Sequence, residues 1–428
     1  MQLINTTFSS LSIRNYRRYA FSQLLSMIGS WMQGTAQSWL VLVLTHSATD
    51  LGITVALQTL PTLLLGPYAG LVADRVDKRK LLFWLQILMG IQAAVLAFST
   101  FTGSTTYTEI LVMSLVLGLN NCFENPARQA FVLEMVGREQ VRNAISLNST
   151  FINVARAIGP AFAGIIIASA GESWCFALNA VSFIPVATSL FRMDVAELQP
   201  VGEVKKAKGQ LLEGFRYVRG VPELLVPLIM MGIIGTFTYE FQVTLPVLAK
   251  DTFRHGSETF GVMTAVMGIG AVIGGLLVAA KGKSGTRALQ ISVSAFGLAV
   301  LASALAGNLG VEYVALFFVG FGSVSFLAMG NSTLQLAASP EMRGRVMAFW
   351  AIAFMGTTPI GGPFIGWLAA HFGARNAALA GALACYLALG ISLVAERHYV
   401  KVRSELSYGD DLEHGGETGI ALPVGIGD

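Results

Sequence analysis

The chain is dominated by long apolar runs, and charged or glycine- and proline-rich breaks separate them. A helix that spans a bilayer needs about 20 mainly apolar residues. The runs predict twelve such spans, near residues 19–44, 51–73, 81–101, 108–128, 143–170, 174–192, 224–249, 260–280, 288–307, 312–333, 346–371 and 376–396. The runs lack the alternation of a membrane β-barrel, and a helix satisfies its own backbone groups in hydrocarbon. The pattern therefore predicts an all-α membrane protein.

The longest interior polar stretch divides these spans into two sets of six. It covers residues 194–220, and residues 211–219 within it predict a short amphipathic helix at the inner surface. We predict an N-terminal six-helix bundle, a cytoplasmic central loop, a C-terminal six-helix bundle and a cytoplasmic disordered tail, over residues 1–193, 194–220, 221–397 and 398–428. The end of the tail is acidic and rich in glycine, as disordered segments often are.

The basic residues predict the orientation of the chain. With the N-terminus inside, 24 of the 28 Lys and Arg residues lie at the inner side, and the outer loops hold only Lys250, Arg254 and Arg375. This split follows the positive-inside rule. We expect both termini in the cytoplasm and the protein in the inner (cytoplasmic) membrane of a bacterium.

Composition excludes several classes of protein. Hydrophobic residues make up 54% of the chain and charged residues 12%, about half the charged fraction of a soluble protein. The net charge of +3 argues against a nucleic-acid partner, and the three scattered cysteines indicate neither a disulfide framework nor a metal site. The sequence has no phosphate-binding loop and no nucleophile elbow. We therefore expect no cofactor, no metal and no enzymatic activity.

The two halves repeat a short motif. Gly159-Pro160-Ala-Phe-Ala-Gly164 in the fifth span is similar to Gly362-Pro363-Phe-Ile-Gly366 in the eleventh, and an arginine stands 18 residues before each proline. Internal repeats with a site at their interface are typical of secondary transporters. We predict that Gly159, Pro160, Gly362 and Pro363 bend their helices, although close helix packing through glycine is an alternative use.

A charged loop follows the second span, with the sequence Gly70-Leu-Val-Ala-Asp74-Arg75-Val-Asp77-Lys78-Arg79-Lys80. Asp74 stands at the end of its helix where the dipole disfavours an anion, so it needs partners such as Arg75, Arg79 or a facing helix N-terminus. We predict a conformational latch formed by Gly70, Asp74, Arg75, Lys78, Arg79 and Lys80. The alternative is an ordinary positive-inside anchor.

This loop resembles the signature loop of the major facilitator superfamily, with Asp77 in place of a usual glycine. The resemblance covers residues 10–400 and implies twelve transmembrane helices in two six-helix halves. The segments that begin at Asn125, Asn143, Asn153 and Pro340 are similar to the branch that contains enterobactin exporters and macrolide efflux proteins. The resemblance implies a proton-coupled exporter, that is, an antiporter of drugs or siderophores. It also links the Gly159-Pro160 motif of the fifth span to exporters.

Charges within a span are costly and mark functional sites, and three of them matter most here: Glu124, Arg156 and Glu240. Arg156 lies 13 residues into its span, about 20 Å along the axis. Glu124 is the nearest acid in the same half, and an exchange of its partner between Arg156 and a proton could couple proton flow to transport. A permanent structural role for Arg156 is the alternative. Glu240 could bind a proton near neutral pH when buried, or could turn toward outer water beside Lys250 or Arg254.

Polar residues also recur on one face of the first span, at Gln23, Ser26, Ser30, Gln33 and Gln37. Such a stripe faces either a water-filled cavity or another helix, and three glutamines favour the cavity. We predict that the substrate cavity is lined by Gln23, Ser30, Gln33, Gln37, Asn120, Asn121, Asn153, Tyr239, Asn331 and Gln335.

Together these features predict a secondary active transporter that acts as a monomer. Its expected partners are membrane lipid, a small-molecule substrate and protons. Three alternatives stay open: an importer with the same fold, a sensor or scaffold derived from it, and a membrane enzyme. A rocking bundle has no intrinsic direction, because the coupled binding events set it.

Overall fold

The computed structural model describes residues 8–199, 210–281 and 284–413, and within these ranges it contains helices and short connections but no strand. The first half consists of η1 (Ser9–Ser12), α2 (Arg14–Thr45), α3 (Ala48–Arg75), α4 (Lys78–Thr102), α5 (Tyr107–Ala170) and α6 (Glu172–Phe191). The short η2 (Val195–Glu197) and α7 (Gln210–Gly220) belong to the central connection. The helix expected over 211–219 thus corresponds to α7.

The second half contains five helical segments that form two broken spans and four helices that run uninterrupted. Its elements are α8 (Pro222–Phe237), α9 (Phe241–Val247), η3 (Leu248–Thr252), α10 (Ser257–Lys281), α11 (Thr286–Ala304), α12 (Leu309–Ala337), α13 (Arg343–Met355), α14 (Thr358–Phe372) and α15 (Ala374–Glu413). The seventh span consists of α8, α9 and η3, and the eleventh consists of α13 and α14.

These helices form twelve membrane spans within the described residues. Ten segments are long and apolar enough to cross a membrane, and α5 contains two spans because its backbone turns at Gly137, where φ is 71°. Glycine reaches this left-handed conformation without steric cost. The twelfth span is α2, whose 32 residues are long enough to cross but include the polar stripe, which lowers its hydropathy. The prediction of twelve helices is confirmed.

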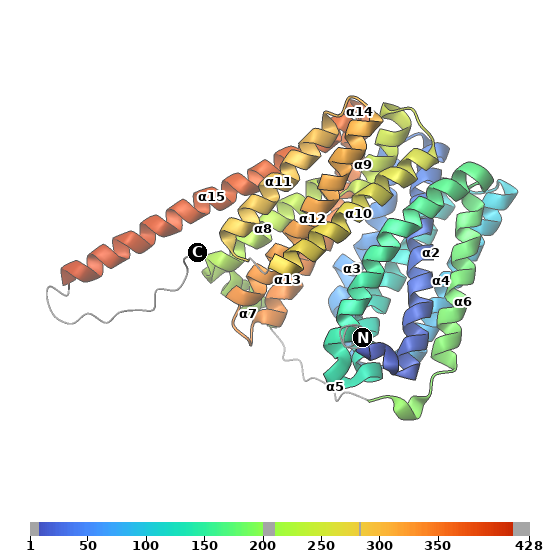
Figure 1. Ribbon diagram of the computed structural model, residues 1–428, viewed down its shortest axis with the longest axis horizontal. Helices are drawn as coiled ribbons and strands as arrows, with labels where there is room; N and C mark the ends of the chain where they lie inside the picture. Colours follow the sequence, from blue (N-terminus) through green and yellow to red (C-terminus); the bar gives the residue numbers. More distant parts are fainter. Residues whose placement is uncertain (1–7, 200–209, 282–283, 414–428) are drawn as a thin grey trace.

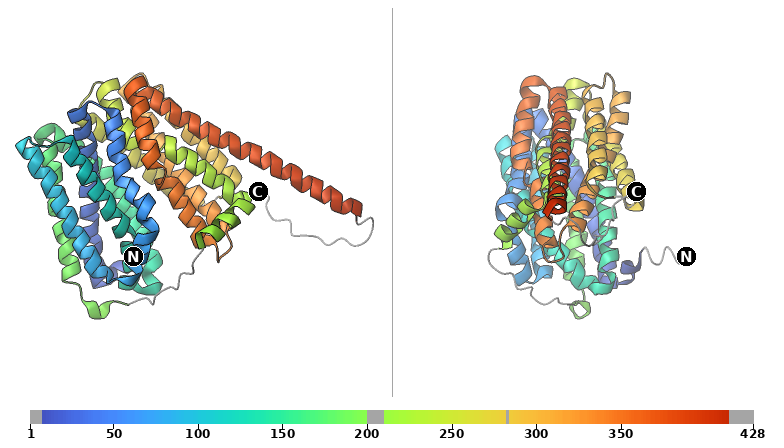
Figure 2. Two further views of the ribbon diagram at one scale, coloured as in Figure 1. Left: turned by 180° about the vertical axis from the view of Figure 1, so that it is seen from behind. Right: turned by 90° about the vertical axis from the view of Figure 1, so that its left-hand side faces the viewer.

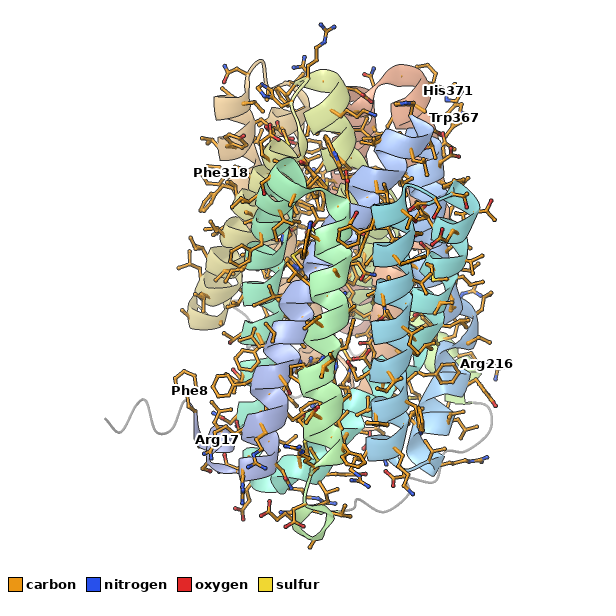
Figure 3. All side chains as sticks on the ribbon, turned by 90° about the vertical axis from the view of Figure 1, so that its right-hand side faces the viewer. Phe8, Arg17, Arg216, Phe318, Trp367 and His371 are labelled. Carbon is orange, nitrogen blue, oxygen red and sulfur yellow. The ribbon has the colours of Figure 1, made fainter. Side chains whose placement is uncertain are left out.

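The two halves lean together at one end and spread apart at the other (Figures 1 and 2). Figure 3 shows Arg17 at the end where the halves spread and His371 at the opposite end. We call these the inner and the outer end, following the orientation that the basic residues predict. The most extensive contacts between halves join α3 to α14 and α5 to α10. The first contact joins the second span to the eleventh, and the other joins the fifth span to the eighth. The two contacts are equivalent, because the eighth and eleventh spans are the counterparts of the second and fifth in the six-span repeat.

The apolar core is also shared between the two halves at one end of the molecule only. One buried cluster combines residues of both halves, such as Leu51 and Ile167 with Val243 and Ile365. It includes the rings of Trp39 and Phe260, whose centroids lie 6.3 Å apart. The other buried clusters of the described chain each lie within a single half. The halves therefore share a core toward the outer end and have separate cores toward the inner end.

The tail differs from its prediction. Residues 398–413 continue α15 as a helix rather than starting a disordered tail, while residues 414–428 lie outside the described residues. The physical reason is that no glycine or proline stands between Gly390 and Gly409, so nothing in the sequence stops the helix after the span ends.

Candidate transport site

A seam of glycines joins the halves at the outer end. Gly52 of α3 contacts the backbone of Gly362 in α14 so closely that a Cβ atom on Gly52 would overlap the Gly362 carbonyl oxygen. In the second interface, a Cβ atom on Gly261 of α10 would lie 2.7 Å from the carbonyl oxygen of Pro160. Real Cβ atoms do not approach this closely, so the seam requires glycine. Lys250 adds a polar contact, since its Nζ donates to the Leu42 carbonyl at 2.8 Å.

The Gly-Pro pairs serve this packing and do not interrupt their helices. Both α5 and α14 remain helical through Gly159-Pro160 and Gly362-Pro363. The helices are therefore not broken at these pairs, and a bend there stays a prediction. The helix of the eleventh span instead ends at Met355 and restarts at Thr358, and that of the seventh breaks at residues 238–240. The prolines are tolerated because the surrounding helices pack tightly around them.

Arg156 lies between the halves. Its guanidinium carbon is 5.1 Å from the centroid of the Trp31 ring in α2, a cation–π distance. Tyr239 of the second half lies within electrostatic range of its guanidinium. Its Nε is buried and has no hydrogen-bond acceptor. A Cβ atom on Gly159 would lie 2.7 Å from the Cβ of Trp31, so glycine at this position allows α5 to approach α2.

Glu124 does not contact Arg156, which corrects the predicted pairing. Its carboxylate lies 3.7 Å from the Arg128 guanidinium, one helical turn along α5. It also accepts hydrogen bonds from the side-chain amides of Asn120 at 3.0 Å and Gln86 at 3.3 Å. Arg156 instead faces the Trp31 ring of α2, whereas Glu124 faces Gln86 of α4 and Arg128. The side chain of Glu124 therefore belongs to a buried network within the N-terminal half.

Glu240 occupies the break in the seventh span, directly before α9. Its residue is only 3% exposed, and its Oε1 has no hydrogen-bond partner. The Thr358 hydroxyl lies beside the carboxyl group. The carboxyl also lies against the seam, because a Cβ atom on Gly361 would be 2.9 Å from Oε1 and one on Gly362 would be 3.6 Å from Oε2. Glu240 thus faces α14, and the alternative position beside Lys250 or Arg254 is not what the structure shows.

The glutamines of the first span do not line a cavity between the halves, contrary to the prediction. Gln33 donates to Gln92 of α4 at 3.0 Å and accepts from Asn179 of α6 at 2.7 Å. Gln37 donates to Ser114 of α5 at 2.6 Å. Gln23 is buried as well, whereas Ser30 is exposed. Interhelical amides in a membrane satisfy each other because no water is present to do so, and this is the reason for the correction.

We expect Gln33→Leu to destabilise the protein without changing its affinity for solute. The substitution leaves Gln92 and Asn179 with buried, unpaired groups, each of which costs about 1–3 kcal/mol. Thermal unfolding in detergent measures the effect, and Ser30→Ala on the exposed side of the same helix is the matched control. An unchanged melting temperature together with a raised KM for transport would restore the cavity role of Gln33.

The remaining polar candidates are dispersed. Asn120 is buried with Glu124, and Asn121 is half-buried nearby. Asn153 donates to the Ser149 carbonyl of its own helix at 2.9 Å. On α12 the amide of Gln335 donates to the side chain of Asn331. Tyr239 lies within electrostatic range of Arg156, and its own contacts, with Ser323 and Phe354, are within the second half.

The charged loop after α3 is tied into the first half. Lys78 forms an ion pair with Glu134 at 2.8 Å, and Arg79 donates to the Leu190 carbonyl at 3.4 Å. Asp77 caps α4, since its carboxylate accepts from the Lys80 backbone at 3.0 Å, which explains why aspartate suits this position.

Two of the predicted latch residues in α3, Gly70 and Arg75, are open in this conformation. Arg75 is exposed, and a Cβ atom on Gly70 would meet no atom within 4 Å, so no neighbouring helix approaches Gly70. The side chain of Asp74 lies outside the described part of the structure. A latch that closes the inner end would be open here, because the halves spread at that end.

Sequence reasoning missed a second buried acid in the C-terminal half. Glu312 in the first turn of α12 is 0% exposed, and Ser303 donates to its Oε1 at 2.8 Å while Oε2 has no partner. The sequence feature that could have identified Glu312 is its position at the edge of an apolar run, as the first residue of the predicted tenth span. Ser303 also lines a small pocket together with Thr238, in the break of the seventh span, and Thr244 of α9.

In the residues that the structure describes, no group of three His, Cys, Asp or Glu side chains could hold a metal ion. Cys122, Cys175 and Cys385 are all buried as free thiols.

The chain is similar to two transporters of siderophores. It is 26% identical over 363 residues to the staphyloferrin A transporter of Staphylococcus aureus, a match that covers 83% of this chain and 90% of that protein. It is 24% identical over 403 residues to the enterobactin exporter EntS of Escherichia coli K12, which covers 92% and 95% of the two chains.

Solved structures with a similar fold are transporters too. A bacterial homologue of the iron transporter ferroportin in an inward-facing state matches with a TM-score of 0.70 at 14% identity, over 89% of this chain and 98% of the other. A bacterial homologue of the lysosomal transporter Spinster, inward-facing and unoccupied, matches with a TM-score of 0.68 at 15% identity, over 91% and 98%. Residues 5–408 match the family described as transmembrane secretion effector. The chain therefore belongs to this family of membrane transporters with the major facilitator fold, whose members are not enzymes.

Proposed function

We propose that the protein is a secondary active exporter that uses proton entry to expel a small organic solute, of the siderophore or drug type, by alternating access. It acts as a monomer in the inner (cytoplasmic) membrane of a bacterium, with both termini in the cytoplasm. The names of the staphyloferrin A transporter and the enterobactin exporter support the substrate class. The observation that carries the proposal is a buried carboxyl, Glu240, against the glycine seam that joins the halves.

The seam provides the two-state element that alternating access needs. In this conformation α3 and α14 are in backbone contact at the outer end, and the inner ends are apart. For the solute to leave on the outer side, the contacts of Gly52 with Gly362 and of Gly261 with Pro160 must separate. The latch loop around Asp74 would then close the inner end, with Gly70 receiving a helix of the second half.

Glu240 would carry the coupled proton. A charged carboxylate without a cation is costly in this position, so Glu240 is neutral while the seam is closed. The proton would reach the carboxyl from outer water when the seam opens. It would leave to inner water at another stage of the cycle. Because Oε2 of Glu240 lies beside Gly362, gain or loss of the proton changes the packing of α14 against α3. Glu124, which already has a cationic partner in Arg128, is the weaker candidate for this role.

Inside-out membrane vesicles test the proposal, because their outer face is the cytoplasmic face of the transporter. Vesicles with an acidic interior should accumulate enterobactin or staphyloferrin A, used as probes, and a protonophore should abolish the accumulation. A parallel panel of drugs in a deletion strain widens the search for the solute. Accumulation only with the opposite proton gradient would identify an importer, and no gradient-dependent movement of any solute in the panel would overturn the proposal.

A further inference from the structure

Arg156 is a charge deep in a span without an opposite charge. It stands 14 residues before the end of α5 at Ala170, about 21 Å along the helix, so its side chain cannot extend to the outer water. An unpaired guanidinium at such depth costs several kcal/mol or more. Within the described residues, no carboxylate lies within ion-pair distance of it. The protein therefore maintains a half-buried cation deep in a span, and the described residues supply no anion for it.

The groups that face Arg156 from the neighbouring helices are aromatic. Helix α2 contributes the face of Trp31, and Tyr239, in the break of the seventh span, lies within electrostatic range of the guanidinium. The two acids that could have approached it are engaged elsewhere, because Glu124 pairs with Arg128 and Glu240 lies against Gly361. A Trp face attracts a cation but accepts no hydrogen bond in the ring plane, so the guanidinium N–H groups keep their donor capacity.

The surroundings hold these groups in fixed positions. Gly159, three residues after Arg156 on the same face of α5, lets Trp31 approach. The hydroxyl of Tyr239 donates to the Ser323 carbonyl at 2.7 Å, and its ring packs edge-on against Phe354 with centroids 5.1 Å apart. A site whose donor and ring faces are already in place loses little entropy when a ligand binds.

We propose that Arg156 is the anchor for an organic carboxylate of the transported solute, with the rings of Trp31 and Tyr239 packing on the apolar or aromatic body that bears it. A guanidinium presents two parallel N–H donors that match a carboxylate. This inference rests on the proposed export function and adds the chemical class of its substrate. Because Trp31 and Tyr239 belong to different halves, the bound solute would contact both halves.

Equilibrium binding to the purified protein in lipid nanodiscs tests this inference. The probes are radiolabelled salicylate and citrate, each compared with its neutral methyl ester, and inorganic phosphate at equal ionic strength as a competitor. Wild-type protein should bind an acid in preference to its ester. Arg156→Gln should weaken binding of the acid by about ten-fold to a hundred-fold and leave binding of the ester unchanged, while Arg156→Lys should recover part of the loss.

Two controls separate binding from folding. Trp31→Leu keeps the cation and removes the ring, so it should weaken binding of the acid and of the ester alike. Thermal unfolding of each variant shows whether the variant folds. The inference is overturned by equal affinity of wild type and Arg156→Gln for the acids, by absence of acid binding, or by phosphate competing as well as citrate. The export proposal survives those results if vesicles still accumulate a neutral solute, and fails separately if a proton gradient drives nothing.

Discussion

Replacing Glu240 by glutamine is expected to abolish proton-driven accumulation of solute while leaving equilibrium solute binding intact. Glutamine has nearly the same shape as protonated glutamate, so the contacts with Thr358 and Gly361 persist. The amide cannot release a proton, so it mimics one step of the cycle permanently. We expect the accumulation ratio in acid-interior vesicles to fall to one, with solute-for-solute exchange across the membrane preserved.

Glu124→Gln is the matched control, since it also neutralises a buried acid. It leaves the Arg128 guanidinium without its carboxylate, so it should lower thermal stability, by about 3–5 kcal/mol at most for a fully buried pair. Coupling should persist in the protein that folds. Uphill accumulation by the Glu240→Gln variant, or its selective loss in Glu124→Gln, would move the proton site away from the seam.

The second large effect is expected from a single methyl group. Gly52→Ala should reduce transport by about ten-fold or more, because the new Cβ atom overlaps the backbone of Gly362 and must push α14 away. Overpacking of this kind costs about 1–3 kcal/mol, which shifts a two-state equilibrium roughly five-fold to 150-fold. The variant should therefore favour the conformation in which the outer end is open. Initial transport rates at equal amounts of protein in the membrane measure the loss.

Gly66→Ala is the control on the same helix, since a Cβ atom on Gly66 meets no atom within 4 Å. Both substitutions favour the helix by up to about 1 kcal/mol. Any difference in transport rate between the two variants therefore measures the effect of the seam contact. Equal transport by the two variants would show that α3 and α14 need no backbone contact during the cycle.

The arrangement of spans could be predicted because it depends on local properties. Apolar length predicts each crossing, and the break at Gly137 falls between the fourth and fifth predicted spans. The short helix α7 follows from its alternation of apolar and charged residues at helical spacing. The Gly-Pro repeat indicated positions of close approach between helices, and Gly159, Gly362 and Gly366 do contact neighbouring helices.

The polar contacts could not be predicted, because they depend on which helices are neighbours. The stripe on α2 is real, but Gln33 and Gln37 face α4, α5 and α6, and a single helix does not show whether its polar face meets protein or water. Arg156 and Glu124 are both on α5, yet their side chains have different neighbours, Trp31 for the first and Arg128 for the second. Glu240 was identified as a buried acid, whereas its contact with the seam depends on a break in the seventh span that no proline or glycine at residues 238–240 indicates.

The central claim is that the outer and inner ends of the two halves open in alternation. Spin labels at two pairs of exposed positions measure this in lipid nanodiscs: Val76→Cys with Arg343→Cys at the inner end, and Ser104→Cys with Gly307→Cys at the outer end. The native cysteines are buried, so they should label slowly. When Gly52→Ala is added, the inner pair should shorten and the outer pair should lengthen in the same sample. Distances that stay fixed, or change together with the same sign at both ends, would contradict the account.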